Sequence, residues 1–347
     1  MGESSHKKSK PVIGITIGDI NGIGPEVIIK ALEDNRILRL FTPVIYSSAK
    51  VISFYRKNLD KETFNFQQIA SIDKVAHKKV NVLNVWDEAV EITPGHANEI
   101  GGKYAVISLQ KAVADLKEGK IDAITTAPLS KDLVQSDDFK FPGHTEYLTQ
   151  EAGESDSLMF LVHDGLRVGV VTGHIPLQEV SKKVSKDKVI SKLQKMIKSL
   201  QKDFGIKKPK VAVLGLNPHA GENGLLGDEE IKVLIPAMEE VRKGHNIVSG
   251  PFPADGFFGM GSYKQYDGVL AMYHDQGLIP FKTLAFEEGV NYTAGLPFVR
   301  TSPDHGTAFA IAGKNQADPT SFRNALYLAN DIIRQRNENR YENADKK

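Results

Sequence analysis

The chain has 347 residues, more than one simple hydrophobic core usually holds, so we expect two domains. Its 44 Lys and Arg residues nearly balance its 43 Asp and Glu residues, which gives no reason to expect nucleic acid or an anionic membrane as a partner. The absence of cysteine excludes disulfides, thiolate metal sites and a cysteine nucleophile.

Both ends of the chain are polar, and we expect residues 1–10 and 337–347 to be flexible tails. The first ten residues lack the apolar segment of a secretory signal. No stretch approaches the roughly 18 apolar residues that a membrane span requires. We therefore expect a cytoplasmic protein without membrane contact.

Short apolar runs alternate with helical patterns along the rest of the chain. The runs predict buried strands at 12–17, 43–46, 80–85, 123–126, 168–171, 211–216 and 269–272. The helical patterns cover 25–32, 104–116, 189–200, 231–241 and 322–333. Alternating strands and helices predict an α/β fold with mostly parallel sheets and helices on both faces.

A glycine-rich segment, residues 17–26, follows the first strand and leads into the first helix. Backbone N–H groups at such a helix start could bind an anion. The alternative is a tight turn with no ligand. The segment is neither a dinucleotide-binding fingerprint nor a P-loop.

His144 and Thr145 precede a short helix, where their side chains could donate hydrogen bonds to a phosphate or carboxylate. The alternative is that Thr145 only caps that helix.

Three histidines share one sequence context, because His174, His219 and His274 each follow a predicted buried strand by a few residues. In an open parallel sheet, ligands bind outside the carboxyl ends of the strands. Three imidazoles there could bind one cation and leave a position open for substrate. An all-nitrogen set suits Zn, Co, Ni or Mn better than Mg. The alternative is that each histidine only caps or hydrogen-bonds locally.

Lys282, Asn291 and Arg300 are spaced nine residues apart in a region rich in glycine and proline. Two cations and an amide could hold a phosphate, with arginine able to bind it through two N–H groups. Each could instead be an ordinary surface residue. The polar segment 300–308 is a further candidate for a functional loop.

Taken in order, these segments resemble the 4-hydroxythreonine-4-phosphate dehydrogenase family of pyridoxal phosphate biosynthesis. The resemblance covers about residues 11–335. It rests on residues 18–26, 143–146, 217–222, 250–255, 273–277, 295–297 and 304–308. The first and last of these segments also resemble the wider isocitrate and isopropylmalate dehydrogenase superfamily.

The resemblance implies two α/β/α domains with mostly parallel sheets and an interdomain cleft, as in isopropylmalate dehydrogenase. We expect the first domain to comprise residues 11–135 and 305–336. The second, residues 136–304, would carry the metal histidines.

The resemblance also implies specific roles for the residues above. His174, His219 and His274 would bind one divalent cation (Zn, Co, Mn or Mg) in a site shared across a homodimer interface. NAD or NADP would lie in the cleft near residues 301–307. Substrate contacts would come from His144, Thr145, Lys282, Asn291 and Arg300, and cofactor contacts from Thr301, Ser302, Asp304, His305 and Gly306.

The implied reaction is the metal-dependent oxidation of 4-phosphooxy-L-threonine at C3 by NAD. The β-keto acid product would lose CO2 to give 3-amino-2-oxopropyl phosphate, a step of pyridoxine 5'-phosphate biosynthesis. Asp255, Lys282 or a histidine near the metal could carry the proton, and the sequence does not choose among them.

Three other functions compete with this one. The nearest is the same chemistry on D-erythronate 4-phosphate or D-threonate 4-phosphate. A metal-dependent hydrolase or lyase would share the histidines but would not bind NAD. The third is a sensor of phosphorylated metabolites without catalytic activity.

Overall fold

The computed structural model describes residues 10–135, 139–141 and 143–344. The chain packs as two compact units. Unit 1 joins the chain up to Tyr147 to Phe298–Ile333, and unit 2 joins Leu148–Pro297 to the chain from Arg334 onward. The domain boundaries expected above remain a prediction.

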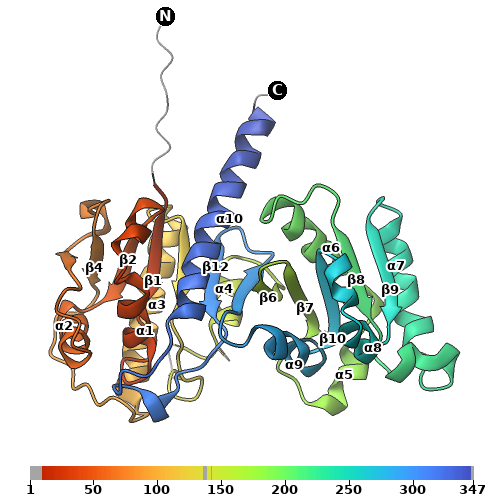
Figure 1. The fold of residues 1–347 in the computed structure, drawn as a ribbon, viewed down its shortest axis with the longest axis horizontal. Coiled ribbons are helices and arrows are strands. Elements are labelled where there is room, and N and C mark those ends of the chain that lie inside the picture. Colours follow the sequence, from red (N-terminus) through yellow and green to blue (C-terminus); the bar gives the residue numbers. More distant parts are fainter. Residues whose placement is uncertain (1–9, 136–138, 142, 345–347) are drawn as a thin grey trace, which may run out of the picture. The chain divides into compact units, whose positions relative to one another are not determined.

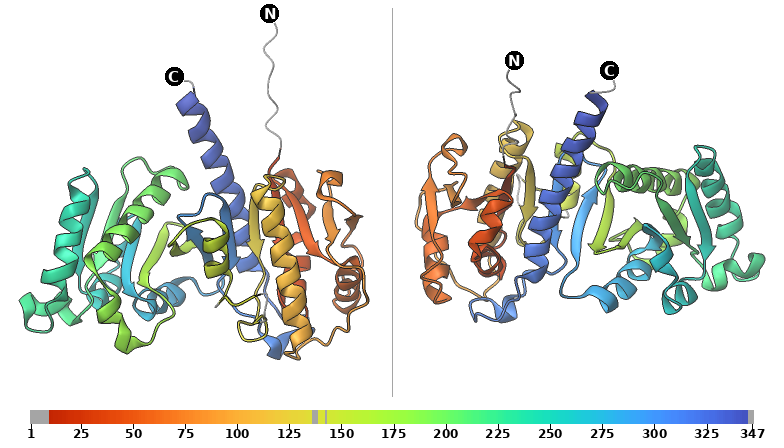
Figure 2. Two further views of the ribbon diagram at one scale, coloured as in Figure 1. Left: turned by 180° about the vertical axis from the view of Figure 1, so that it is seen from behind. Right: turned by 45° about the horizontal axis from the view of Figure 1, so that its top comes forward.

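Unit 1 contains a parallel sheet with the strand order β3-β4-β2-β1-β5-β12 (Figure 1). Its strands are β1 (Val12–Thr16), β2 (Thr42–Ser47), β3 (Phe66–Ile69), β4 (Val80–Asn84), β5 (Ala123–Thr126) and β12 (Val299–Pro303). Helix α3 (Glu99–Lys117) packs against β1, β2 and β5. On the opposite face lies α1 (Gly24–Leu32), which packs beside α2 (Ala49–Asn58) (Figure 2).

Unit 2 contains a mixed sheet with the order β11-β6-β7-β10-β8-β9. Its strands are β6 (Leu158–His163), β7 (Leu166–Thr172), β8 (Lys210–Leu214), β9 (Ile247–Phe252), β10 (Gly268–Tyr273) and β11 (Val290–Ala294). Strand β6 is antiparallel to both β11 and β7, whereas β7, β10, β8 and β9 run parallel to one another.

The helices of unit 2 cover both faces of its sheet. They are α5 (Leu177–Lys183), α6 (Lys186–Lys202), α7 (Ile235–Arg242), α8 (Ala254–Gly259) and α9 (His274–Ala285). Helices α6 and α9 pack on β7 and β10 from opposite faces (Figure 2). Close packing needs Gly277 on α9, because a Cβ atom there would lie 3.0 Å from Val168 and 3.1 Å from Ala271. This contact fixes the start of α9 at the end of β10.

The predicted fold class, mostly parallel α/β sheets with helices on both faces, is confirmed in each unit. The short helix expected after Thr145 is α4 (His144–Glu151), which begins two residues earlier than predicted and includes His144 and Thr145. Helix α10 (Thr320–Ala344) runs well past the predicted end at residue 333, so much of the expected C-terminal tail is helical. Residues 1–9 and 345–347, the rest of the expected tails, lie outside the described residues. In the described chain, no helix combines the length and apolarity that crossing a membrane requires.

Candidate metal and substrate site

The three candidate metal histidines follow three neighbouring parallel strands of unit 2, β7, β10 and β8. His174 comes two residues after β7, and His219 five residues after β8. His274 follows β10 directly and is the first residue of α9. The predicted placement at the carboxyl edge of a parallel sheet is therefore confirmed.

The imidazoles of His174 and His274 face each other, with ring centroids 5.5 Å apart. Two imidazoles that bind one tetrahedral cation at about 2.0–2.1 Å place their ring centroids about 5 Å apart. His274 Nδ1 lies 2.7 Å from Asp275 Oδ1, a carboxylate contact that orients the ring and leaves its other nitrogen for a ligand. The pair therefore fits two ligands of one divalent cation.

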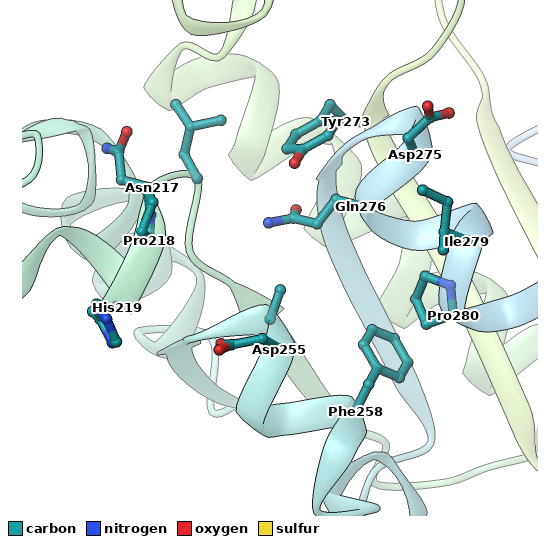
Figure 3. A pocket seen from close by; sticks show the side chains of 12 residues that line it. Asn217, Pro218, His219, Asp255, Phe258, Tyr273, Asp275, Gln276, Ile279 and Pro280 are labelled. Carbon is teal, nitrogen blue, oxygen red and sulfur yellow. The ribbon is translucent and has the colours of Figure 1, made fainter.

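His219 lies beside a cavity of about 480 Å³ in unit 2. Figure 3 shows Asp255 and Gln276 pointing into this hollow and the ring of His219 at one side of it. Among the described residues of one chain, no three His, Asp or Glu side chains form a group that could hold a metal. One chain thus pairs His174 with His274 but does not add His219, and the three-histidine site remains a proposal.

The backbone around His219 is unusual, because residues 219–223 all have positive φ angles, between 44° and 84°. Four of these five residues are not glycine. A left-handed helical conformation costs a non-glycine residue about 1–2 kcal/mol. Such strain persists only where surrounding contacts enforce it, and it concentrates at functional sites. The strained turn makes this segment a candidate for a functional role, independently of its histidine.

Unit 1 holds a candidate anion site built from Arg300 on β12 and His144 at the start of α4. The Arg300 side chain is 3% exposed, and its Nη2 donates to Thr126 Oγ1 at 2.9 Å. Burial lowers the pKa of Arg300 to about 10, so it stays charged at neutral pH. Burial, Arg300 and Lys131 lower the pKa of His144 well below its usual range. A fixed cation beside a neutral imidazole suits a phosphate.

The other predicted substrate residues lie at three places. Thr145 is in the first turn of α4, Lys282 is on α9, and Asn291 is on β11. The side-chain oxygen of Asn291 is buried and has no hydrogen-bond partner among the described residues. A buried acceptor of this kind suits a donor on a ligand.

The glycine-rich segment after β1 uses its own backbone N–H groups, which favours the tight turn over the anion site. The N–H groups of Asp19 and Gly22 donate to Pro128 O and Asp19 O, and that of Ile23 to Thr307 O. The N–H of Asn21 donates to Asp19 Oδ1. The turn therefore supports the segment that contains Thr307.

The predicted cofactor residues lie in and after β12. Thr301 and Ser302 are buried strand residues, and Thr301 Oγ1 donates to Ala325 O within unit 1. Asp304, His305 and Gly306 follow the strand, and the N–H of Asp304 donates to Ser321 Oγ. The Thr301 hydroxyl thus has an internal partner, which the sequence did not indicate.

Among the proton-carrier candidates, Asp255 lines the cavity beside His219, and Lys282 is a partly buried residue of α9. Sequence reasoning missed Tyr273, Asp275 and Gln276, which line the same cavity. These residues flank His274 in the chain, and that adjacency was the available signal.

The fold and the histidine pair define an α/β protein with a candidate metal site at the carboxyl edge of a parallel sheet. The chain belongs to the family described as "Pyridoxal phosphate biosynthetic protein PdxA", whose model matches residues 39–329. The dehydrogenase activity and the pyridoxal phosphate context expected from the resemblance are confirmed at the level of this family.

Relatives with known names are similar over most of the chain. A 4-hydroxythreonine-4-phosphate dehydrogenase of Bacteroides thetaiotaomicron is 48% identical, over 95% of this chain and 91% of the relative. A crystal structure of 4-hydroxythreonine-4-phosphate dehydrogenase from Klebsiella pneumoniae has a TM-score of 0.81 at 36% identity, covering 95% of this chain and 99% of the other. A Cutibacterium acnes protein named "Putative D-threonate 4-phosphate dehydrogenase" is 39% identical, over 93% of this chain and 94% of the relative.

Proposed function

We propose that the chain catalyses the NAD-dependent oxidation of 4-phosphooxy-L-threonine at C3, with a divalent cation bound by His174, His219 and His274. The single observation that carries this proposal is the His174–His274 pair, with ring centroids 5.5 Å apart at the ends of β7 and β10. The relatives named 4-hydroxythreonine-4-phosphate dehydrogenase support the substrate.

In this mechanism, Arg300 and the neutral His144 bind the phosphate of the substrate. Because Arg300 is buried, its charge is weakly screened and fixes the phosphate, and with it the reacting carbon. Asp255, Lys282 or a histidine near the cation accepts the proton of the C3 hydroxyl. The cation would polarise that hydroxyl, and the nicotinamide would accept the hydride. The β-keto acid then decarboxylates to 3-amino-2-oxopropyl phosphate.

We further propose that the active species is a homodimer in which the partner completes the cation site. The family resemblance supports such a shared site, and the described residues of one chain bring His174 near His274 without His219. Unit 2 also exposes large apolar side chains that a partner could cover, among them Leu225, Met260, Ile279 and Phe286. The choice of Zn, Co, Mn or Mg, the choice of NAD or NADP, and the cytoplasmic location remain predictions.

The test replaces one imidazole of the observed pair and measures NADH formation from 4-phosphooxy-L-threonine. His174→Ala should abolish metal-dependent turnover while the circular dichroism spectrum stays that of the native chain. Undiminished turnover by this variant, or by the native chain after complete chelation of metal, would contradict the proposal.

One alternative substrate class has an observation in its favour, the similarity to a relative named for D-threonate 4-phosphate. D-Threonate 4-phosphate and D-erythronate 4-phosphate carry a hydroxyl where 4-phosphooxy-L-threonine carries an amine. Values of kcat/KM measured side by side for the three compounds decide between them. The family's dehydrogenases leave the hydrolase, lyase and sensor hypotheses without support.

A further inference from the structure

A buried carboxylate outside the predicted site residues contacts the segment that carries His219. Glu230 is 2% exposed and begins a π-helical turn, Glu230–Leu234, that leads into α7. Its Oε1 accepts from the backbone N–H groups of Leu216 and Asn217, at 2.7 and 2.8 Å. Its Oε2 accepts from Asn217 Nδ2 at 2.9 Å. The carboxylate therefore accepts hydrogen bonds from the backbone between β8 and His219.

The same carboxylate packs against both sides of the left-handed turn at residues 219–223. A Cβ atom on Gly215, before the turn, would lie 3.1 Å from Glu230 Oε1. A Cβ atom on Gly221, inside the turn, would lie 2.7 Å from Oε2. The carboxylate is one of several constraints at these glycines, because Ala220 Cα would lie closer still to a Cβ on Gly215, at 2.8 Å, and Gly221 has a φ of 84°. Glu230 thus provides the acceptors and the packing that hold a strained turn in place.

A second, partly buried contact joins this segment to the segment of His274. Gln276 Nε2 donates to Gly215 O at 2.6 Å, and Gln276 Oε1 accepts from Met272 N at 2.7 Å. The end of β8 is thereby tied to the end of β10, and Figure 3 shows Gln276 reaching across between them. Glu230 therefore stabilises a segment that the Gln276 hydrogen bonds connect to the end of β10, next to His274.

We propose that Glu230 is a positioning residue that acts through His219: it fixes the left-handed turn so that the His219 imidazole is presented to the cation. This inference rests on the proposed function, because it assumes that His219 is a ligand. It goes beyond that function in assigning the ligand's orientation to a carboxylate 11 residues later in the chain. Partners that orient metal ligands typically change metal affinity about 10- to 100-fold when removed.

The experiment measures Co2+ binding by the full chain, by calorimetry and by the visible absorption of bound Co2+. Glu230→Ala should weaken Co2+ binding about 10- to 100-fold. Glu230→Gln should lose less Co2+ affinity than Glu230→Ala, because its amide oxygen can still accept hydrogen bonds from the backbone N–H groups of Leu216 and Asn217. Glu239→Gln removes the same charge from the exposed side of α7 and should bind like the native chain.

Thermal unfolding of each variant without metal separates positioning from folding. All titrations are done well below the lowest unfolding temperature, so lower stability alone leaves the Co2+ affinity of the folded chain unchanged. If Glu230→Ala does not fold, Glu230→Gln carries the test. Affinity within twofold of native in the variants that fold would overturn the proposal.

A double-mutant cycle tests whether Glu230 acts through His219. His219→Ala alone should weaken Co2+ binding, and adding Glu230→Ala should weaken it no further. An additional loss of the same size in the His219→Ala background would overturn the positioning role. Binding by the native chain separates the two hypotheses. If the native chain does not bind Co2+, the proposed metal site is wrong. If the native chain binds Co2+ and the Glu230 variants bind it equally well, only the positioning role is wrong.

Discussion

Arg300 is a cation held almost out of water, and the proposed phosphate site depends on it. Arg300→Ala should raise the KM for the phosphorylated substrate about 10- to 100-fold, since a hydrogen bond to a charged group contributes about 1.5–3 kcal/mol. The KM of Arg300→Lys should lie between those of the native chain and Arg300→Ala, because lysine keeps the charge but lacks the planar pair of donors. Steady-state kinetics with saturating NAD provide the measurement. An unchanged KM in Arg300→Ala would remove Arg300 from the phosphate site.

His144 yields a prediction about protonation. Its pKa is lowered by burial first, and then by the charges of Arg300 and Lys131. Lys131→Gln removes one of these cations from an exposed position and should therefore raise the pKa of His144. An NMR titration of the histidine ring resonances measures the change. A His144 pKa that stays constant or falls in Lys131→Gln would contradict this electrostatic account.

The same shift determines how stability depends on pH. Above the unfolded-state histidine pKa of about 6.5, neither state binds the proton. As the pH falls below that value, His144 is protonated in the unfolded chain but stays neutral in the folded chain. The free energy of unfolding therefore falls. His144→Asn should therefore lose less stability than the native chain between pH 6.5 and the lower pKa of folded His144. Denaturant titrations at several pH values test this, and equal losses would refute it.

At the scale of the elements, the predicted strands were those with continuous apolar runs. The buried parallel strands β1, β2, β4, β5, β7, β8 and β10 all have such runs and were predicted. Strand β3 was missed because its sequence, Phe-Gln-Gln-Ile, lies at a polar sheet edge. Strand β12 was missed because the polar residues Arg300, Thr301 and Ser302 interrupt its apolar pattern. Apolar runs thus reveal most of the central parallel strands, although the apolar strand β6 was also missed.

The residues of the candidate site could likewise be predicted only in part. The positions of His174, His219 and His274 after β7, β8 and β10 could be predicted, because the apolar runs of these strands end clearly in the sequence, whereas their role as ligands stays a prediction. Glu230 could not be found, since a Glu beside another Glu before an amphipathic helix is typical of a solvated surface. Its burial depends on the left-handed turn at residues 219–223, which follows from tertiary packing rather than local propensity.

The two glycines at the start of α3 give a prediction of opposite sign to helix propensity. Alanine in a helix is favoured over glycine by about 1 kcal/mol. However, a Cβ on Gly102 would lie 2.0 Å from Leu133 O, and one on Gly101 would lie 2.2 Å from Asp19 Oδ1. Gly102→Ala should therefore destabilise the chain, by about 1–3 kcal/mol.

Denaturant unfolding measures the effect, and α8 offers the control. A Cβ on Gly256 would meet nothing within 4 Å, so Gly256→Ala should be neutral or stabilising. If Gly102→Ala proved as stable as Gly256→Ala, the close approach of α3 to the segment after β5 would be wrong.

At the scale of the whole molecule, the decisive question is whether one chain can complete the cation site. His174 and His274 meet within a single chain, whereas no group of three ligands forms among its described residues. If the partner supplies His219, a chain lacking His174 and a chain lacking His219 should each be inactive alone. Their mixed dimer would then hold one site with both defects and one intact site.

Mixing the two inactive variants under conditions that exchange subunits should therefore restore activity. With random pairing, half the dimers are mixed and each has one of two sites intact, so about one quarter of native turnover is expected. The matched control mixes His174→Ala with His274→Ala, which damage the same end of the site and cannot complement each other. Activity recovered in the first mixture and not in the second requires a site shared between subunits, because no arrangement confined to one chain could rebuild three ligands from those two variants.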